Sequence, residues 1–167
     1  MENFTANIEN LLNKKLSLYR QINDLLKEER EYIVSMDVTS LWKSSDQKKQ
    51  LTDQIQAVKK EVLTSLKGRL NIDNLDIRSF SISYLIRVMP LSKPEKNRFR
   101  QVKLAIDIEK DELKQVAIDN KKYVQEYLLV IDDIMSVFVD NSKQAQYSHT
   151  GTMPSTKNSN CLIHAEV

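Results

Sequence analysis

The most apolar stretch of the chain, residues 120–139, has hydrophobic positions around more of a helix than one buried stripe needs. With spacings of 3 and 4, one helical face consists of Tyr123, Tyr127, Val130, Ile134 and Val137. A second seam beside it consists of Val124, Leu128, Ile131, Met135 and Phe138. Such a helix must be covered on more than one side. The pattern leaves two interpretations open, the core of a bundle or a surface for a partner.

Apolar doublets at a period of seven predict a first long helix over residues 5–36. The doublets are Leu11-Leu12, Leu18-Tyr19, Leu25-Leu26 and Tyr32-Ile33. Together they make a face wider than the two-position seam of a simple dimeric coiled coil. The pattern therefore favours packing in a bundle.

Asp37 predicts the start of a second helix over residues 38–68, because its carboxylate can accept the free N–H groups of the first turn. Its apolar face includes Leu41, Leu51, Ile55, Val58, Val62 and Leu66. The short connection indicates an antiparallel hairpin, but a kinked continuous helix stays open because the connection lacks Gly and Pro. The opening stretch, Trp42–Gln50, is more polar, and we expect it to be more solvated.

Residues 71–91 have the least regular pattern. A short helix over 77–89 and an alternating strand over 80–84 both fit the sequence. We favour the helix, since a strand here has no second strand to pair with.

A helix over residues 93–139 is the longest expected element, with Ser92 as its N-cap and Pro94 in its first turn. Its seam follows spacings of 3 and 4 from Phe99 onward, and two positions of the seam are polar, Glu109 and Asn120. A buried amide at Asn120 would fix the register of the helices.

Its length of about 70 Å, against about 45 to 50 Å for each earlier helix, leaves part of this last helix without a neighbour unless it bends or meets the short helix. We expect the half next to Asn120 to be better covered than the end from Ile131 to Phe138.

Composition supports an all-α fold. Two glycines and three prolines among 167 residues supply too few turns for a β-sandwich or an α/β sheet. We expect one domain over residues 1–140, an elongated antiparallel helical bundle or coiled coil of three long helices plus a short one. Residues 141–167 are rich in Ser, Thr and Asn, which is typical of a flexible tail.

The nearly balanced charge gives no support for a nucleic-acid or membrane partner. Lys and Arg number 25 against 23 Asp and Glu, so no large field favours nucleic acid or an anionic membrane. The basic run Lys93–Lys103 could bind phosphate, but Glu95 interrupts it and no aromatic series accompanies it. The run therefore favours a solvated helix face over a nucleic-acid site.

The N-terminal residues lack the pattern of a secretion signal, and no stretch reaches the 18 apolar residues of a membrane span. The single cysteine, Cys161, permits no disulfide within the chain. We expect a cytoplasmic protein without membrane insertion.

Catalytic chemistry is not expected. Both histidines, His149 and His164, lie in the predicted tail, and no glycine-rich phosphate loop occurs. The carboxylate pair Asp132-Asp133 lacks the Glu-x-x-His motifs of di-iron bundles. The sequence thus predicts no catalytic residue, metal site or cofactor.

Several positions together resemble the FlgN family of flagellar type III export chaperones. They are Leu25-Leu26, Glu29, Ile33, Asp37, Leu41, Lys48, Leu51 and Ile55, then Asn120, and Tyr147 with Gly151 in the tail. The resemblance spans most of the chain but does not include residues 71–91.

The resemblance implies a cytoplasmic chaperone of bacterial flagellum assembly that binds the C-terminal helices of hook–filament junction proteins and prevents their premature assembly. Its expected substrate-binding residues are Val124, Tyr127, Leu128, Ile131, Ile134, Met135 and Phe138. A tail tyrosine of the family docks on the flagellar export gate, and Tyr147 is the matching position. The alternative is a scaffolding coiled coil whose last helix pairs with its own copy as a homodimer.

Overall fold

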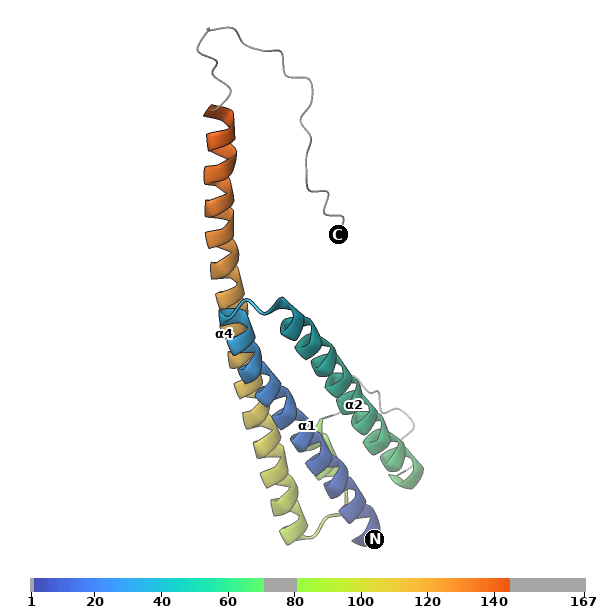
Figure 1. Ribbon diagram of the computed structural model, residues 1–167. Coiled ribbons are helices and arrows are strands. Elements are labelled where there is room, and N and C mark those ends of the chain that lie inside the picture. Colours follow the sequence, from blue (N-terminus) through green and yellow to red (C-terminus); the bar gives the residue numbers. More distant parts are fainter. Residues whose placement is uncertain (1, 71–80, 145–167) are drawn as a thin grey trace, which may run out of the picture. The chain divides into compact units, whose positions relative to one another are not determined.

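The computed structural model describes residues 2–70 and 81–144, and within these ranges all four elements are helices: α1 (Glu2–Val34), α2 (Val38–Leu70), α3 (Ile82–Val88) and α4 (Lys93–Gln144) (Figure 1). The predicted all-α fold of three long helices and a short one is confirmed. The described residues divide into two units at the boundary between Val124 and Gln125, and the units are taken separately below. None of the described helices has a stretch apolar enough to span a membrane.

The predicted helix ends agree closely with the observed ones at two places and differ at others. α2 begins at Val38 and α4 at Lys93, as the sequence predicts, whereas α4 continues to Gln144, past the expected end at Val139. The part of the expected tail over 145–167 lies outside the described residues. Residues 82–84 are helical, so the alternative of a strand over 80–84 is wrong for the part that is described.

Met36 closes the turn between α1 and α2. Its φ of 54° places it in the left-handed region, which glycine normally occupies after a helix. The N–H of Asp37 donates to the carbonyl of Tyr32 (2.9 Å) and the N–H of Met36 to that of Ile33 (3.2 Å), the pair of bonds of a Schellman motif. The chain thus reverses without Gly or Pro, and the hairpin interpretation is confirmed over the kinked helix.

Asp37 then begins α2. Its carboxylate accepts the N–H of Ser40 (3.0 Å) and the Ser40 hydroxyl (2.6 Å). These two bonds are the largest causes that lower the pKa of Asp37. One residue therefore ends the first helix and caps the second, which explains how the connection can be so short.

The first part of α4 runs parallel to α1. Contacts join Glu9 to Arg98 at 3.2 Å, Arg20 to Glu109 at 3.0 Å and Arg30 to Tyr123. The partners are 89, 89 and 93 residues apart along the chain. A nearly constant offset is the signature of parallel helices, whereas α2 returns antiparallel to α1 (Figure 1). α2 makes this possible, because its antiparallel course brings the chain back to the start of α1, where Val62 and Leu66 pack with Ile8 and Leu12.

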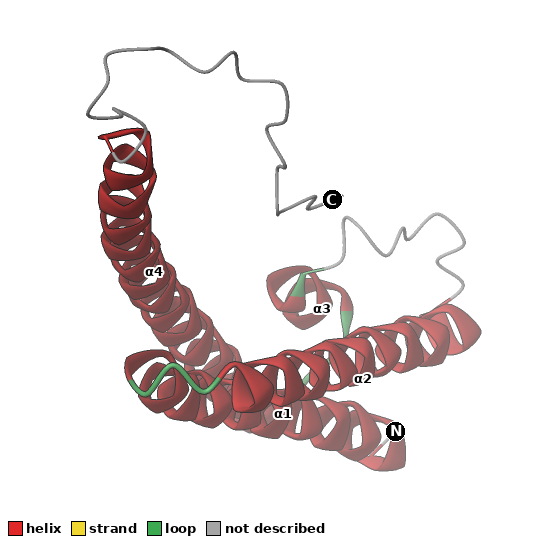
Figure 2. Cartoon of the chain, turned by 45° about the horizontal axis from the view of Figure 1, so that its top comes forward, coloured by secondary structure: helices red, strands yellow, loops and turns green. Residues whose placement is uncertain are grey.

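Two hydrophobic clusters fill the first unit. One joins all four helices and includes Ile8, Leu12, Val62, Leu66, Leu85, Met89, Phe99 and Ile106. The other lies nearer the turn between α1 and α2 and includes Leu18, Ile22, Leu26, Ile55 and Val58, with Leu113 and Val116 of α4 packed against it. α3 lies beside the other helices only at the first cluster (Figure 2). It therefore closes one end of the core, and the second cluster is formed by α1, α2 and α4.

Candidate functional site

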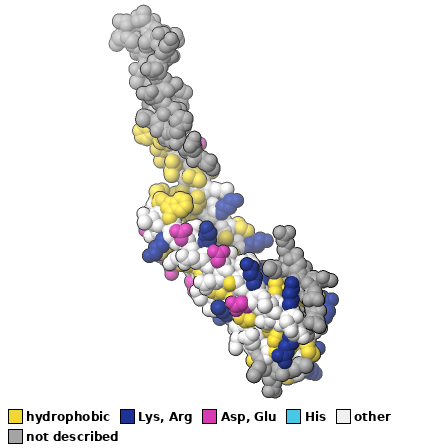
Figure 3. All heavy atoms as spheres, turned by 90° about the vertical axis from the view of Figure 1, so that its right-hand side faces the viewer, with side chains coloured by type: hydrophobic (Ala, Val, Ile, Leu, Met, Phe, Trp, Pro, Cys, Tyr) yellow, Lys and Arg dark blue, Asp and Glu magenta, His cyan; other side chains and the backbone are white. Residues whose placement is uncertain are grey.

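Six of the seven predicted substrate-binding residues have exposed side chains. Val124 lies at the end of the first unit and the others in the second, and the exposed fractions of the six range from 38% for Val124 to 67% for Phe138. Tyr127 is half-buried. Hydrophobic side chains follow this stretch of α4 in the space-filling view (Figure 3). We call these seven residues the apolar face.

Three neighbours of the apolar face were not among the predicted site residues, yet they are equally exposed. They are Leu129, Val130 and Val137, at 55% to 65% exposure. The helix of the second unit is therefore apolar and exposed on several sides. The better cover expected next to Asn120 is found at Tyr123 and Tyr127, which are half-buried. It does not extend to Leu128, which is more exposed (58%) than Ile131 (47%).

Asn120, in the first unit, is buried and hydrogen-bonded, unlike the exposed residues of the apolar face. Its side chain is 4% exposed, and its amide donates to the carbonyl of Leu26 at 2.7 Å and to the Glu29 carboxylate at 3.3 Å. The other oxygen of Glu29 accepts from Lys48. Since these residues belong to α4, α1 and α2, one polar contact joins three helices. Glu29, Lys48 and Asn120 were all among the positions of the family resemblance.

Glu109, the other polar position of the seam, also contacts α1. Its carboxylate accepts from Arg20 at 3.0 Å and from the Asn23 amide at 2.8 Å, and its backbone carbonyl accepts from the same amide at 3.0 Å. The bond from Arg20 is the largest cause that lowers the pKa of Glu109, and the bond from Asn23 acts in the same direction. Asn23 is 2% exposed, so this contact is part of the packed interface.

Arg30 and Tyr123 make the contact nearest to the end of α1. The guanidinium of Arg30 donates to the Tyr123 hydroxyl and lies 4.7 Å from the centre of its ring. The next hydrophobic residue of α4, Val124, is already exposed. Buried seam and exposed face thus follow each other directly along the sequence.

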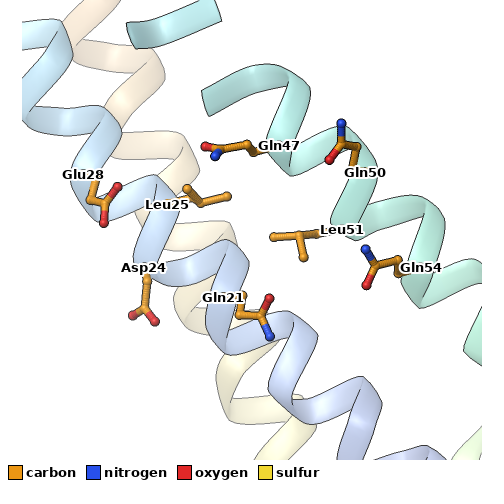
Figure 4. A pocket seen from close by; sticks show the side chains of 8 residues that line it. All are labelled: Gln21, Asp24, Leu25, Glu28, Gln47, Gln50, Leu51 and Gln54. Atoms are coloured by element: carbon orange, nitrogen blue, oxygen red, sulfur yellow. The ribbon is translucent and has the colours of Figure 1, made fainter. Parts of the chain in front are cut away.

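A groove between α1 and α2 is a second place where a partner could lie. Leu25 and Leu51 point toward each other across it (Figure 4). Its other lining residues are Gln21, Asp24, Glu28, Gln47, Gln50 and Gln54. With six polar residues around two leucines, the groove offers much less hydrophobic surface than the apolar face. The apolar face therefore remains the stronger candidate.

Other predicted site features can be placed only in part. Tyr147, the expected docking residue for the export gate, lies outside the described residues. Within the ranges 2–70 and 81–144, no three His, Cys, Asp or Glu side chains come together as a metal site.

The comparisons with curated proteins and with solved structures give no match. The family described as FlgN protein, in contrast, matches residues 1–155. That range includes all of the described helices and every residue on which the sequence resemblance rests. The chain belongs to the FlgN family.

Proposed function

We propose that the protein is a cytoplasmic flagellar export chaperone that binds hook–filament junction proteins and prevents their assembly before type III export. The observation that carries the proposal is the apolar face, six of whose seven side chains are exposed over about four helical turns. A client helix with a matching hydrophobic stripe would bury this surface and lose its own tendency to self-associate. No cofactor or chemical step is needed.

The expected mode of binding is helix against helix. The client's C-terminal helix lies along the apolar face with its hydrophobic residues at spacings of 3 and 4. Because hydrophobic residues surround the helix of the second unit, including Leu129 and Val130, it can accept more than one client helix or the two sides of a helical hairpin.

A pair of matched variants tests the site. Ile131→Asp places a charge on the apolar face, and Ile108→Asp makes the same change at a similarly exposed position in the first unit, with exposed fractions of 47% and 57%. We expect Ile131→Asp to weaken binding of a junction protein's C-terminal helix by about tenfold or more, measured by calorimetry, because burial of one isoleucine is lost. Ile108→Asp should retain the affinity. Equal losses in both variants would refute the assignment of the face.

Self-association through the same face is the competing function, since the surface would serve a second copy as well as a client. Sedimentation velocity of the free protein separates the two. A monomer at micromolar concentration agrees with the chaperone proposal. A stable dimer that Ile131→Asp dissociates would instead indicate a scaffolding coiled coil.

Docking on the export gate is proposed for Tyr147. The Tyr147→Ala variant should bind the client helix with unchanged affinity and the cytoplasmic part of the export gate more weakly. A loss of client affinity would place Tyr147 in the client site instead.

A further inference from the structure

We propose that a basic hollow between α3 and α4, in the first unit, binds an acidic segment of a partner protein. The hollow has a volume of about 460 Å³ and is lined by Ser83, Ile86, Arg87, Lys96, Arg100 and Lys103. Four of these six residues are cations. Such a concentration is unusual in a chain with nearly equal numbers of basic and acidic residues, 25 and 23.

The acidic residue nearest in sequence does not neutralise the hollow. Glu95 interrupts the basic run of α4, but its carboxylate accepts the N–H of Ser92 at 2.7 Å and the Ser92 hydroxyl at 2.6 Å. These bonds, the largest causes that lower the pKa of Glu95, complete a capping box at the start of the helix. The carboxylate is thus engaged at the helix terminus.

Two basic residues of this run already pair with carboxylates of the protein itself. Arg98 points to α1, where it pairs with Glu9 at 3.2 Å. Lys103 pairs with Asp107 at 2.6 Å. Within residues 2–70 and 81–144, Arg87, Lys96 and Arg100 have no carboxylate partner. Arg87 lies over the ring of Tyr84, 6.0 Å from its centre, a contact that uses the face of the guanidinium and leaves its N–H groups free to donate. The three cations can therefore each bind a carboxylate of a ligand.

The spacing of the cations fits several carboxylates better than one small anion. Lys96, Arg100 and Lys103 follow each other at 4 and 3 residues on one face of α4, which extends about 10 Å along the axis. A single phosphate cannot reach across that distance. Acidic side chains on one face of an extended segment recur at about 6.7 Å, and at i and i+4 of a helix they recur at about 6 Å. Either arrangement meets two or three of the cations together.

Arg87 makes the hollow more than a charged helix surface, because it comes from α3. Its guanidinium can bind a carboxylate through two parallel N–H bonds. Ser83 adds a hydroxyl donor and Ile86 a hydrophobic wall from the same helix. None of the six lining residues is aromatic, so the hollow lacks the stacking surface on which nucleic-acid bases are usually bound.

Titration of the isotope-labelled full-length protein, followed by NMR, tests the proposal. The probe is a synthetic peptide of alternating Glu and Ser, at about 50 mM salt so that screening is weak. We expect amide shifts to change at residues 83–87 and 96–103. Arg87→Gln should weaken binding about twofold to fivefold, as for one exposed ion pair. Lys96→Gln/Arg100→Gln should weaken it about fourfold to twentyfold.

Matched controls distinguish binding at this hollow from non-specific attraction to positive charge anywhere on the surface. Lys114→Gln/Lys121→Gln removes two positive charges from exposed positions elsewhere on α4 and should leave the affinity within a factor of about two. An uncharged peptide of alternating Gln and Ser should not bind. The proposal is overturned by equal losses in the control variant, by the absence of acidic-peptide binding, or by tighter binding of a single-stranded oligonucleotide. None of these outcomes depends on the apolar face.

Discussion

The two parts of α4 have the same hydrophobic periodicity and opposite exposure. In the part that belongs to the first unit, Phe99 and Ile106 are 0% and 1% exposed, whereas Ile134 and Phe138 in the second unit are 51% and 67% exposed. Both pairs consist of one phenylalanine and one isoleucine, and Ile106 and Ile134 lie on the same seam with spacings of 3 and 4. Periodicity therefore indicates which residues share a face, but it does not indicate whether another helix covers that face.

The largest effect on stability is expected from a pair of matched substitutions, one in each part of α4. Phe99→Ala leaves a cavity in a packed cluster and should lower the free energy of unfolding by about 3 to 5 kcal/mol. Phe138→Ala removes an exposed side chain and should change it by less than about 0.5 kcal/mol. Urea unfolding followed by circular dichroism gives both values. A large loss for Phe138→Ala would mean that the second part of α4 is packed in solution.

Polar residues of α4 allow a second comparison of the same kind. Asn120→Ala deprives the Glu29 carboxylate and the Leu26 carbonyl of a buried donor, so we expect a loss of about 1 to 2 kcal/mol. Gln125→Ala, at an exposed position of the second unit, should stay within about 0.5 kcal/mol. The same unfolding experiment measures both. If the two variants were equally stable, the three-helix contact at Asn120 would contribute nothing to stability.

A smaller change in stability is expected when the pH is lowered. The pKa of Glu109 is lowered in the folded state, so its contribution is fully present above the unfolded value of about 4.3 and is lost as pH falls through the folded value. Unfolding free energies measured between about pH 5 and pH 3 should fall less steeply in Glu109→Gln than in the unmodified protein. An identical slope in Glu109→Gln would show that the contact with Arg20 and Asn23 does not stabilise the fold.

Local signals in the sequence predicted most of the fold. Asp37 and Ser92 predicted helix starts because capping depends on residues only a few positions apart. The seam predicted that Glu109 and Asn120 lie on the side of α4 that faces its neighbours, and both contact α1.

Long-range pairings could not be predicted in the same way. The contact between Asn120 and Leu26 joins residues 94 apart, and no periodicity encodes such a pairing. The seven site residues come from both seams of the apolar stretch. Val130 and Val137 lie on the same face as Tyr127 and Ile134, so the pattern alone could not distinguish them from the site residues. Arg87 was likewise unremarkable in the sequence, because its place beside Lys96 and Arg100 depends on how α3 packs against α4.

The parallel pairing of α1 with α4 has a consequence during synthesis. Their partners are 86 to 94 residues apart, whereas the hairpin with α2 closes over a much shorter distance. At about 5 to 20 residues per second, the ribosome needs roughly 4 to 19 s to complete the α4 partners of α1. Throughout that interval, the hydrophobic side of α1 that later receives Phe99 and Ile106 is bare in the nascent chain. A protein proposed to cover exposed helices of its clients therefore passes through a stage in which its own first helix is exposed.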